Sequence, residues 1–366
     1  MSSIRHLYNA LRGAWRERLR WSSTVQEPGP VRVYYGHGCL PGVVDVGGGG
    51  IVKCQDLARV FPNTPVRPNL LYIVSSALEP YAVSMARSAK RAGARIVINQ
   101  NGVAYPAWHG SGWEATNKSM QLLHEMADYI FYQSAFCKLS AERFLGKAGT
   151  PAEVLHNAVD TGVFRPARRR GGGGELVLLT AGSHTKRYRV ACAIDALVAL
   201  RGSGIAARLI VAGKYCWRDE RVALEEARDY ARGRCVGDVV EFLGPYSQED
   251  AANLMNRADI LLHATYNDSC PRLVLEAMAC GLPVVCSGSG GTPELIGSTA
   301  GLGVPAPLDW EREHAPDPLA LAAAVVAVFR DLGTFSAAAR DRAVRLFDVK
   351  PWIERHRAVF SSLGRW

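Results

Sequence analysis

"NDSCPRLVLEAMACGLPVV", residues 267–285, predicts a short amphipathic helix that leads into a strand. Pro271 suits the first turn of a helix, where its missing N–H costs nothing, and the "CGLP" further on ends the helix. "PVVC" has the composition of a short buried strand. Asp268 therefore precedes the helix and Glu276 lies in its second turn, so two acids flank a helix N-terminus, which attracts anions. A surface helix with two solvated acids is the alternative for this stretch taken alone.

The same alternation of helices and apolar strands runs through the whole chain. The predicted strands of the first half are 31–35, 70–75, 95–100, 129–134 and 153–157. Those of the second half are 176–182, 208–213, 239–244, 259–265 and 283–287. Nearly continuous apolar strands joined by helices indicate parallel sheets that are covered on both faces. We therefore predict an α/β fold of two doubly wound, Rossmann-like domains.

Length and local composition predict the domain boundaries. At 366 residues the chain is long for one core, and "RPARRRGGGGE" (165–175) mixes charge with four glycines, as a linker does. The closing segment 347–363 has the pattern of one more helix. We predict a basic amphipathic segment at 1–29, a first domain at 30–167, a second domain at 168–348 and a last helix at 349–366.

The composition narrows the class of protein. No apolar run reaches the roughly 18 residues of a membrane span, and the N-terminus lacks the long apolar core of a signal peptide. Nine cysteines without a CxxC pair favour reduced thiols, so we expect a cytoplasmic protein. The 43 Lys and Arg against 34 Asp and Glu favour acidic partners. Nucleic acid is not expected, because no aromatic-basic pattern or known module accompanies the charge.

The first 21 residues predict an amphipathic helix with a basic border. At about 100° per residue, one sector collects Ile4, Leu7, Tyr8, Leu11, Trp15 and Leu19. The arginines that flank this sector are Arg5, Arg12, Arg16 and Arg20, while Arg18 falls within it. Two interpretations are equally supported. The helix lies on an anionic membrane surface at the inner face of the membrane, or it docks on its own domain or on a second subunit.

A glycine run at 45–50 follows the first predicted strand and opens a helix. Glycines there let the backbone approach a ligand closely, which makes Gly49 and Gly50 candidate binding residues. The nearby "GHGCLPG" misses the GxGxxG pattern because Pro41 replaces its last glycine, which argues against a dinucleotide fingerprint. A flexible surface turn is the alternative.

Two further loops follow strand ends in the second half. "AGSHTKRYRV" (181–190) places three cations where an α/β sheet binds ligands, and these suit a diphosphate: Lys186, Arg187 and Arg189. "SGSGGTPELIG" (287–297) opens another helix, with Thr292 as the predicted cap and Pro293 in the first helical position. The sequence has no DxD, HExxH, Walker or GxSxG motif, so we expect no metal site.

Together these features resemble glycosyltransferase family 4, the retaining transferases of GT-B fold. The resemblance covers nearly everything from about residue 31 to the end. Its most specific part is "DSCPRLVLEAMACGLPVVCSGSGGTPELI", in which two acids are separated by seven residues and followed by ACGxPVV and GGxPE. "HNAVDTGVFRP" (156–166) and "VEFLGPYSQEDAANLMNRADILLHATY" (240–266) are similar to family segments. The resemblance implies two domains that face a central cleft, and a last helix that crosses back to the N-terminal domain.

The resemblance also implies roles for the acids. Glu276 would bind the ribose hydroxyls of a sugar nucleotide, and Asp268 would contact hydroxyls of the donor sugar. The amides of Leu273 and Val274 would cap the diphosphate at the helix N-terminus. The other donor-binding positions that we assign are Gly49, Gly50, Gly182, Ser183 and Arg272.

Three departures from the family pattern stand out. The first acid is Asp268 instead of the usual Glu. The family's Arg and Lys of the phosphate loop fall at Ser183 and Tyr188, so Lys186 and Arg187 are the candidates to replace them. The usual acceptor-side His falls at Asn101. We assign the acceptor side to Asn101, Tyr105 and His109, with Asn101 also counted among the catalytic candidates.

The implied reaction moves a sugar from a nucleotide-diphosphate donor to an acceptor hydroxyl, with retention and without a metal or other cofactor. Cations and helix N-termini would stabilise the charge that grows on the leaving diphosphate. The expected acceptor is a glycan or a lipid-linked intermediate of surface polysaccharide or glycolipid synthesis. The alternatives are an epimerase or phosphorylase on the same fold, or a nucleotide-sugar-binding protein with weakened catalysis.

Overall fold

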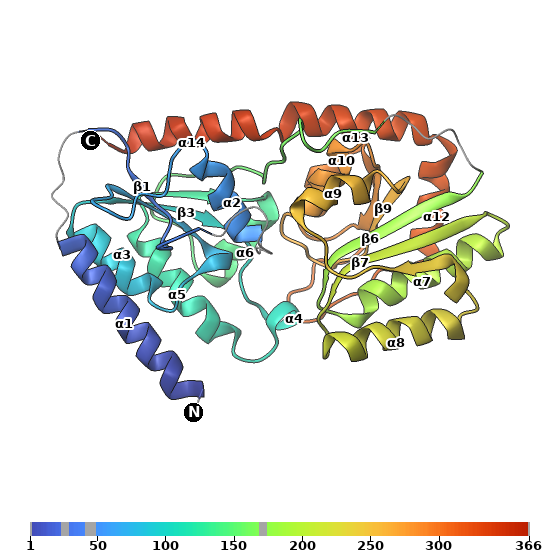
Figure 1. Ribbon diagram of the computed structural model, residues 1–366, viewed down its shortest axis with the longest axis horizontal. Coiled ribbons are helices and arrows are strands. Elements are labelled where there is room, and N and C mark those ends of the chain that lie inside the picture. The colour runs from blue at the N-terminus through green and yellow to red at the C-terminus, as the bar shows by residue number, and fades with distance from the viewer. Residues whose placement is uncertain (1, 23–28, 41–48, 168–173, 365–366) are drawn as a thin grey trace. The chain divides into compact units, whose positions relative to one another are not determined.

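The computed structural model describes residues 2–22, 29–40, 49–167 and 174–364 of the chain (Figure 1). For residues 2–7, 9 and 49 it describes the backbone only. The chain divides into two compact units. The first unit contains Met1–His156 and Lys350–Trp366, and the second contains Asn157–Val349. The segments 45–48 and 168–173, which belong to the predicted glycine run and the predicted linker, lie outside the described residues.

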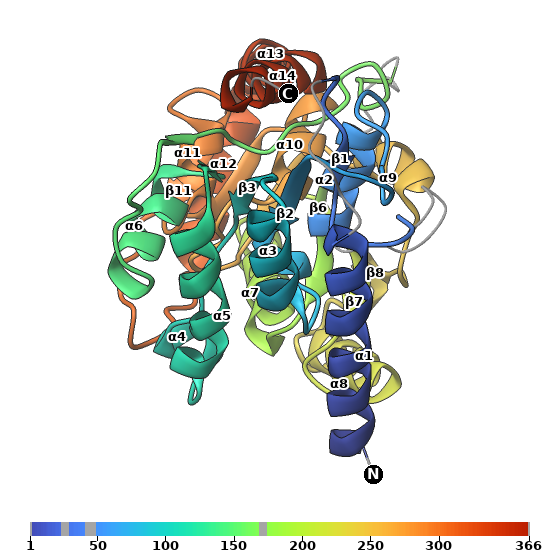
Figure 2. The same cartoon turned by 90° about the vertical axis from the view of Figure 1, so that its left-hand side faces the viewer.

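The first unit is built on a parallel sheet whose described strands follow chain order, β1-β2-β3-β4-β5. The strands are β1 (Val33–Tyr34), β2 (Leu70–Val74), β3 (Arg95–Gln100), β4 (Tyr129–Tyr132) and β5 (Ala152–Val154). The helices are α1 (Ser2–Ser22), α2 (Gly49–Ala58), η1 (Ser75–Ala77), α3 (Ala82–Arg91), α4 (Pro106–His109), α5 (Trp113–Met126), α6 (Ala135–Phe144) and α14 (Val349–Leu363). Figure 2 shows α3 and α5 covering one face of this sheet, with α1 beside α3.

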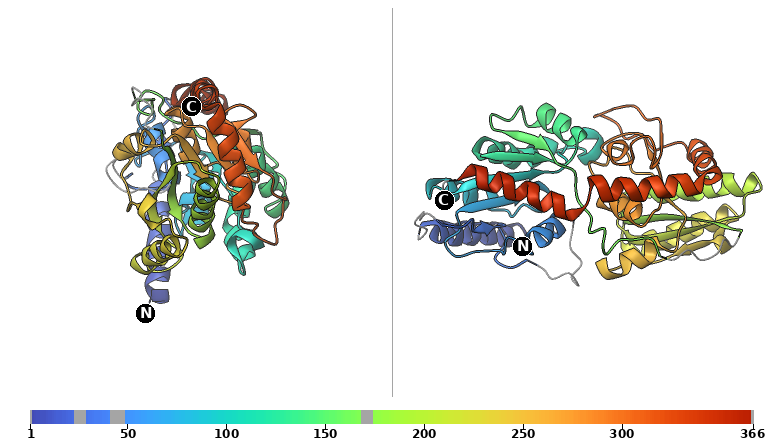
Figure 3. Two further views of the ribbon diagram at one scale, coloured as in Figure 1. Left: turned by 90° about the vertical axis from the view of Figure 1, so that its right-hand side faces the viewer. Right: turned by 90° about the horizontal axis from the view of Figure 1, so that it is seen from above.

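The second unit has a six-stranded parallel sheet in the order β11-β10-β9-β6-β7-β8. Its strands are β6 (Leu176–His184), β7 (Ala207–Tyr215), β8 (Val240–Phe242), β9 (Ile260–His263), β10 (Val284–Ser287) and β11 (Gly301–Val304). Its helices are α7 (Arg187–Gly202), α8 (Glu220–Gly233), η2 (Gly237–Val239), α9 (Gln248–Met255), α10 (Arg272–Ala279), α11 (Thr292–Ile296), α12 (Pro318–Arg330) and α13 (Leu332–Leu346). Two apolar clusters, one on each face of the sheet, form the core. Figure 3 shows the helices that cover the two faces.

The strand order of the second sheet reverses between β6 and β9. From β6 the chain proceeds outward through β7 and β8, then returns to β9 and proceeds the other way through β10 and β11. The loops after two such neighbouring strands leave in opposite directions, and the crevice that opens between them is where open α/β sheets bind ligands. The fold therefore points to the carboxyl ends of β6 and β9 as the place for a site.

The α/β fold with two parallel sheets is as predicted, and each predicted strand overlaps an observed one. The last helix packs on the first unit, also as predicted. His356 of α14 is fully buried, with its ring 4.4 Å from that of Phe131 and its Nε2 3.0 Å from the hydroxyl of Tyr72. Strand β11 was missed, because its "GLGV" sequence has little strand propensity. It forms by pairing with β10, where Gly301 meets Val284 so closely that a Cβ would lie 1.9 Å from the Val284 carbonyl oxygen.

The predicted boundary at 165–175 needs correction. The chain passes between the units at 156–157 and again at 349–350. Residues 157–167 belong to the second unit because hydrogen bonds hold them there. Arg340 donates to the carbonyl of Phe164 at 2.8 Å, and the amide of Ala167 donates to the side-chain oxygen of Asn256 at 2.8 Å. Residues 1–22 are likewise not a separate segment, because α1 packs on α3 within the first unit.

Among the described residues, no single helix is long and apolar enough to span a membrane. Helices α12 and α13 pass that test only together, as a pair bent by 92°.

Candidate functional site

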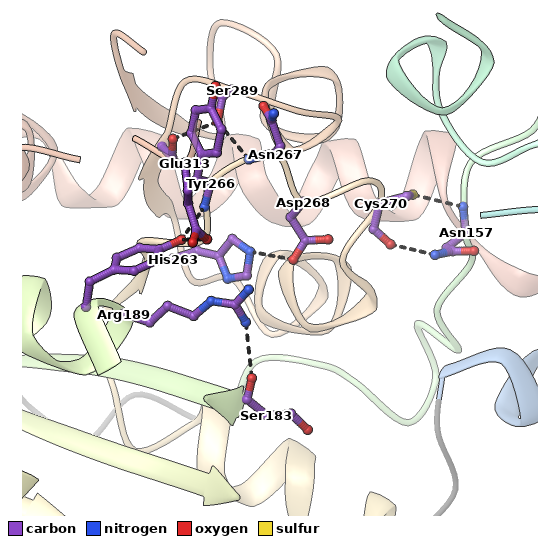
Figure 4. A network of polar contacts seen from close by, with 12 residues as sticks. Asn157, Ser183, Arg189, His263, Tyr266, Asn267, Asp268, Cys270, Ser289 and Glu313 are labelled. Atoms are coloured by element: carbon purple, nitrogen blue, oxygen red, sulfur yellow. Dashed lines mark hydrogen bonds and ion pairs between the residues drawn. The ribbon is translucent and has the colours of Figure 1, made fainter. Parts of the chain in front are cut away.

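His263, the last residue of β9, and Asp268, in the loop that follows, form a close pair at the strand-order reversal. The Nε2 of His263 lies 3.1 Å from a carboxylate oxygen of Asp268 (Figure 4). His263 is nearly buried, whereas about a quarter of the Asp268 side chain is exposed. The histidine therefore fixes the orientation of a carboxylate that is still open to a ligand.

The backbone around Asp268 is held by the glycine loop that follows β10. The amide of Gly291 donates to the Asp268 carbonyl at 2.7 Å, and the amide of Asn267 donates to the hydroxyl of Ser289 at 2.9 Å. Gly290 has a φ of +76°, and a Cβ there would lie 2.4 Å from the Asp268 carbonyl oxygen. Asn267 itself has a φ of +50°, which is uncommon for a residue other than glycine. The positive φ of Asn267 and the absence of a side chain at Gly290 thus allow the two loops to hold the backbone of Asp268.

The helix α10 begins immediately after this loop, with Pro271 as its N-cap. In its first turns Arg272 Nε lies 3.0 Å from a carboxylate oxygen of Glu276, and both side chains are mostly buried. The amide of Val274 donates to the carbonyl of Pro271 at 3.1 Å, so one of the two amides predicted to meet a phosphate is engaged within the turn. The side chain of Leu273 reaches to 3.7 Å of the Cβ position of Gly182, so the start of α10 and the end of β6 lie side by side.

The three cations after β6 have different surroundings. Lys186 pairs with Glu313 at 3.3 Å, and the guanidinium of Arg187 lies 5.1 Å from the ring centre of Tyr230 on α8. Arg189 instead donates from Nη1 to the carbonyl of Ser183 at 3.2 Å, and its buried Nε has no hydrogen-bond partner among the described residues. In Figure 4 its guanidinium lies on the side of the His263–Asp268 pair. Arg189 is therefore the cation directed at the strand-order reversal.

His184, at the end of β6, is buried in its neutral form. Burial lowers its pKa to about 4, although its Nε2–H donates to the Ala212 carbonyl at 3.1 Å, and the charges of Arg189 and His263 lower the pKa further. His184 is consequently neutral at pH 7. Of His184 and Arg189, only Arg189 therefore contributes positive charge at the end of β6 at this pH.

Tyr188 occupies the position where the family resemblance expects a lysine. Its hydroxyl donates to Glu313 at 2.9 Å and accepts the amide of Tyr266 at 3.1 Å. Burial is the main cause that raises its pKa to about 12, so the hydroxyl stays protonated. This tyrosine ties the loop after β9 to α7 and to Glu313.

The helix caps near the site differ from the prediction by one residue. Pro271 is the N-cap of α10, and α11 begins at Thr292 with Gly291 as its N-cap. The hydroxyl of Thr292 is buried and makes no cap hydrogen bond. Asp268 and the glycine loop meet through the Gly291 amide, but α11 has only five residues and its threonine does not cap it.

In the first unit, Gly50 and Asn101 come together through Ser76. The side-chain amide of Asn101 donates to the Ser76 hydroxyl at 2.7 Å, and a Cβ on Gly50 would lie 2.6 Å from the same oxygen. Both residues therefore lie at the carboxyl ends of β2 and β3. Tyr105 is buried and stacks on Phe144 with 5.7 Å between ring centres.

His109, the third residue assigned to the acceptor side, is exposed at the end of α4, and its Nε2 lies 3.0 Å from the Thr116 hydroxyl. Gly49 is the first residue of α2, next to Gly50. No contact joins His109 to Asn101 among the described residues.

Residues 167–314 match the family model described as glycosyl transferases group 1. The match contains the strand-order reversal, the His263–Asp268 pair, Arg189 and the whole of α10. It covers less than half of the chain and leaves out the first unit.

Named relatives agree with this match. D-inositol 3-phosphate glycosyltransferase of Mycobacteroides abscessus is 29% identical over 219 residues, which are 58% of this chain and 46% of that protein. The enzyme of the same name from Mycobacterium bovis is 33% identical over 153 residues, 39% of this chain and 30% of its own length. The chain thus spans less than half the length of these relatives.

Solved structures show that the fold is the GT-B fold. Anabaena HepE in complex with UDP has a TM-score of 0.68 at 20% identity, over 85% of this chain and 81% of that one. WaaG, described as a glycosyltransferase involved in lipopolysaccharide biosynthesis, has a TM-score of 0.63 at 16% identity, over 90% of this chain and 98% of its own.

Two features of the site were missed as site residues from the sequence. His263 was counted only as part of a predicted strand, although its position five residues before Asp268 at a strand end was a usable signal. Arg189 was noted among the cations but not chosen. The helical spacing from Arg187 was the available clue, since residues two apart on a helix do not share a face.

Proposed function

We propose that this protein is a retaining, metal-independent glycosyltransferase that moves a sugar from a nucleotide-diphosphate donor to an acceptor hydroxyl. The main observation behind this proposal is that Asp268 and Glu276 lie on either side of the start of α10. This place is the strand-order reversal of the sheet, within the segment that matches the group 1 family model. A carboxylate beside a helix N-terminus suits a ligand that has hydroxyls next to phosphates, because the acids accept from hydroxyls while amides and cations meet the phosphates.

The donor would lie along the start of α10. Glu276 would accept from the ribose hydroxyls, and Arg272, its partner at 3.0 Å, is a candidate to bind a phosphate. Asp268, held by His263, would accept from hydroxyls of the donor sugar. The amide of Leu273 would meet the diphosphate, next to Gly182 and Ser183.

The barrier to transfer lies in separating an oxocarbenium-like sugar from a diphosphate. Arg189 would stabilise the charge that grows on the leaving group, since its guanidinium is directed at this region and its Nε has no partner among the described residues. Lys186 and Arg187 remain further candidates for this role. Retention would follow if the leaving phosphate takes the proton of the acceptor hydroxyl on the same face of the sugar, and no protein nucleophile is then needed.

The acceptor would bind in the first unit, near Asn101 and Tyr105 of the loop between β3 and α4, and near His109 of α4. We propose a glycan or lipid-linked acceptor of surface polysaccharide or glycolipid synthesis in the cytoplasm. The likeness to WaaG and to D-inositol 3-phosphate glycosyltransferases supports a glycoconjugate pathway. A uridine nucleotide is the first donor to test, because HepE structures contain UDP and UDP-glucose.

A nucleotide-sugar-binding protein without turnover is the second candidate. Tyr188 favours this candidate, because it stands where the family resemblance expects a lysine. Among the described residues its hydroxyl bonds only to Glu313 and to the amide of Tyr266. The two candidates differ in turnover. Release of nucleotide from the sugar donor supports the transferase, whereas binding without release supports the second candidate.

The experiment is a thermal-shift panel of UDP, GDP, ADP and CMP. A ligand of the folded state stabilises it by about 2.7 kcal/mol at a hundredfold excess over its Kd. We expect one nucleotide to raise the melting temperature of the wild type and of Glu225→Ala, a surface control on α8, but not of Glu276→Ala. Product analysis with the matching sugar nucleotide then gives the anomeric configuration. An equal shift in Glu276→Ala would overturn the site, and an inverted product would overturn retention.

A further inference from the structure

Helix α1 packs on the first unit through its small and polar face. Gly13 lies against the ring of Tyr81, where a Cβ would come within 2.2 Å of a ring carbon. One turn on, the buried Glu17 accepts from the hydroxyl of Tyr34 at 3.0 Å, and the buried Trp21 lies 6.2 Å from the same ring. Gly13, the hydrogen bond between Tyr34 and Glu17, and the buried Trp21 therefore hold this helix to the unit.

The apolar stripe of the same helix faces away from the unit. Tyr8 is 61% exposed, Leu11 63%, Trp15 62% and Leu19 48%. These residues are three or four positions apart, so they form one continuous row along the helix. The predicted members Ile4 and Leu7 have side chains outside the described residues. A docked helix normally buries its apolar face, and here that face is the exposed one.

Cations border this row, and no acid does among the described residues of α1. Arg12 and Arg16 are exposed beside the row, and Arg18 is exposed within the sector that the sequence predicts to be apolar. Glu17, the one acidic residue among the first 22, is turned inward to Tyr34. The outer face of α1 is thus both apolar and uniformly positive.

We propose that the outer face of α1, formed by Tyr8, Leu11, Trp15 and Leu19 with Arg12, Arg16 and Arg18, docks on an anionic lipid surface. Apolar side chains enter the boundary between headgroups and acyl chains, tryptophan and tyrosine favour that boundary, and arginines pair with lipid phosphates. Both interpretations left open by the sequence then hold at once, because one face binds the unit and the other binds lipid.

The positive charge of the outer face of α1 favours anionic lipid over a second copy of the chain as its partner. If two α1 helices met through this face, the three exposed arginines of each would approach those of the other without an acid to compensate. An anionic bilayer supplies negative charge at high density and accepts the apolar row. This inference rests on the first unit alone and stands whether or not the proposed function is correct.

The test is cosedimentation of the full chain with vesicles of phosphatidylcholine alone and of phosphatidylcholine with 30% phosphatidylglycerol. We expect binding to the anionic vesicles only, and weaker binding at high salt. Leu11→Ser and Trp15→Ser should each lower the partition coefficient about tenfold, given the apolar area that each would bury. Leu139→Ser, an equally apolar residue exposed at 48% on α6, should bind as wild type does.

A second control distinguishes the contribution of the α1 arginines from that of the net charge of the protein. Arg12→Gln combined with Arg16→Gln should lower binding about tenfold or more, whereas Arg221→Gln combined with Arg330→Gln, exposed on the second unit, should change it little. Equal losses in the two double variants, equal binding to both vesicles or an unchanged Leu11→Ser would each overturn the proposal. A lipid-free dimer in sedimentation velocity that Trp15→Ser abolishes would replace it with self-association.

Discussion

Arg189 is the residue that we propose to act in place of the arginine and lysine that the family resemblance expects at Ser183 and Tyr188. Its guanidinium is partly buried at the end of β6, where Nη1 binds the Ser183 carbonyl. Positive charge kept in such a place without a carboxylate partner among the described residues costs solvation energy, which an incoming diphosphate would offset. Lys186 has such a carboxylate partner in Glu313, and Arg187 stacks on Tyr230.

This reasoning predicts that Arg189→Ala impairs turnover of the sugar nucleotide far more than Arg187→Ala does. A charge-assisted hydrogen bond to a phosphate contributes about 1.5–3 kcal/mol, so kcat/KM should fall roughly 10- to 100-fold. Arg187→Ala, which removes a neighbouring exposed cation, is the matched control and should stay within about threefold. Steady-state nucleotide release measures both. The reverse order would return the role to Arg187.

His356 predicts a pH dependence of stability. Burial lowers the pKa of His356 to about 3, from an ordinary value near 6.5, although its Nδ1–H donates to the carbonyl of Trp352. Between these values the unfolded chain binds a proton that the folded chain refuses, so stability is complete above pH 6.5 and falls as the pH is lowered. From pH 7 to pH 5 this one group should cost about 2 kcal/mol.

The check is denaturant unfolding at both pH values for the wild type and for His356→Gln. Glutamine can still accept from the Tyr72 hydroxyl but does not titrate, so its loss of stability between pH 7 and pH 5 should be smaller by about 2 kcal/mol. The exposed His109→Gln serves as the control and should lose as much as the wild type. The same loss in all three proteins would refute this assignment.

Among the elements, strands were easier to predict than boundaries. Strands such as 95–100 carry their own signal, because buried parallel strands are nearly continuous apolar runs. The hydrogen bonds of Arg340 and Asn256 to the segment 161–167 carry no such signal, since their partners are backbone groups about 90 to 180 positions away. The glycine-rich stretch 165–175 has the composition of a linker, whereas the chain passes between the units at His156 and Asn157, where the composition gives no such signal.

The same limit applied to the site. The acids around α10 and the glycine loop were found because their spacing is local to one helix and one turn. His263 and Arg189 are functional candidates only because β6 and β9 are neighbours in the sheet. The local sequence around either residue carries no signal of that pairing. The apolar stripe of α1 is visible in the sequence, but the face that docks is set by the fit of Gly13 against the Tyr81 ring, which only the structure shows.

Helix α1 provides a prediction at the scale of an element. Gly13→Ala should destabilise its docking by about 1 kcal/mol or more, because the added Cβ would come within 2.2 Å of the Tyr81 ring, which must move. Gly202→Ala, at the end of α7 with open space around it, should be neutral or stabilising, as alanine usually is in a helix. Hydrogen exchange of residues 8–21 gives the readout. Equal protection in both variants would show that Gly13 does not set the contact.

At the scale of the whole molecule, the residues proposed for the donor belong mainly to the second unit and those for the acceptor to the first. Only Gly49 and Gly50 of the donor set lie in the first unit, at the start of α2. This division makes a test of the two roles possible within the intact chain, because hydrogen exchange reports on each unit separately.

The nucleotide that stabilises the protein should protect amides at 182–189, 263–276 and 288–294 and leave the first unit unchanged. The corresponding sugar nucleotide should add protection at 49–53, because the sequence assigns Gly49 and Gly50 to the donor, and Gly50 packs closely against Ser76 within the first unit. Glu276→Ala should show neither effect at the same concentrations. Protection confined to the first unit would place the nucleotide on the wrong sheet for this proposal, and no added protection with the sugar nucleotide would remove Gly49 and Gly50 from the donor site.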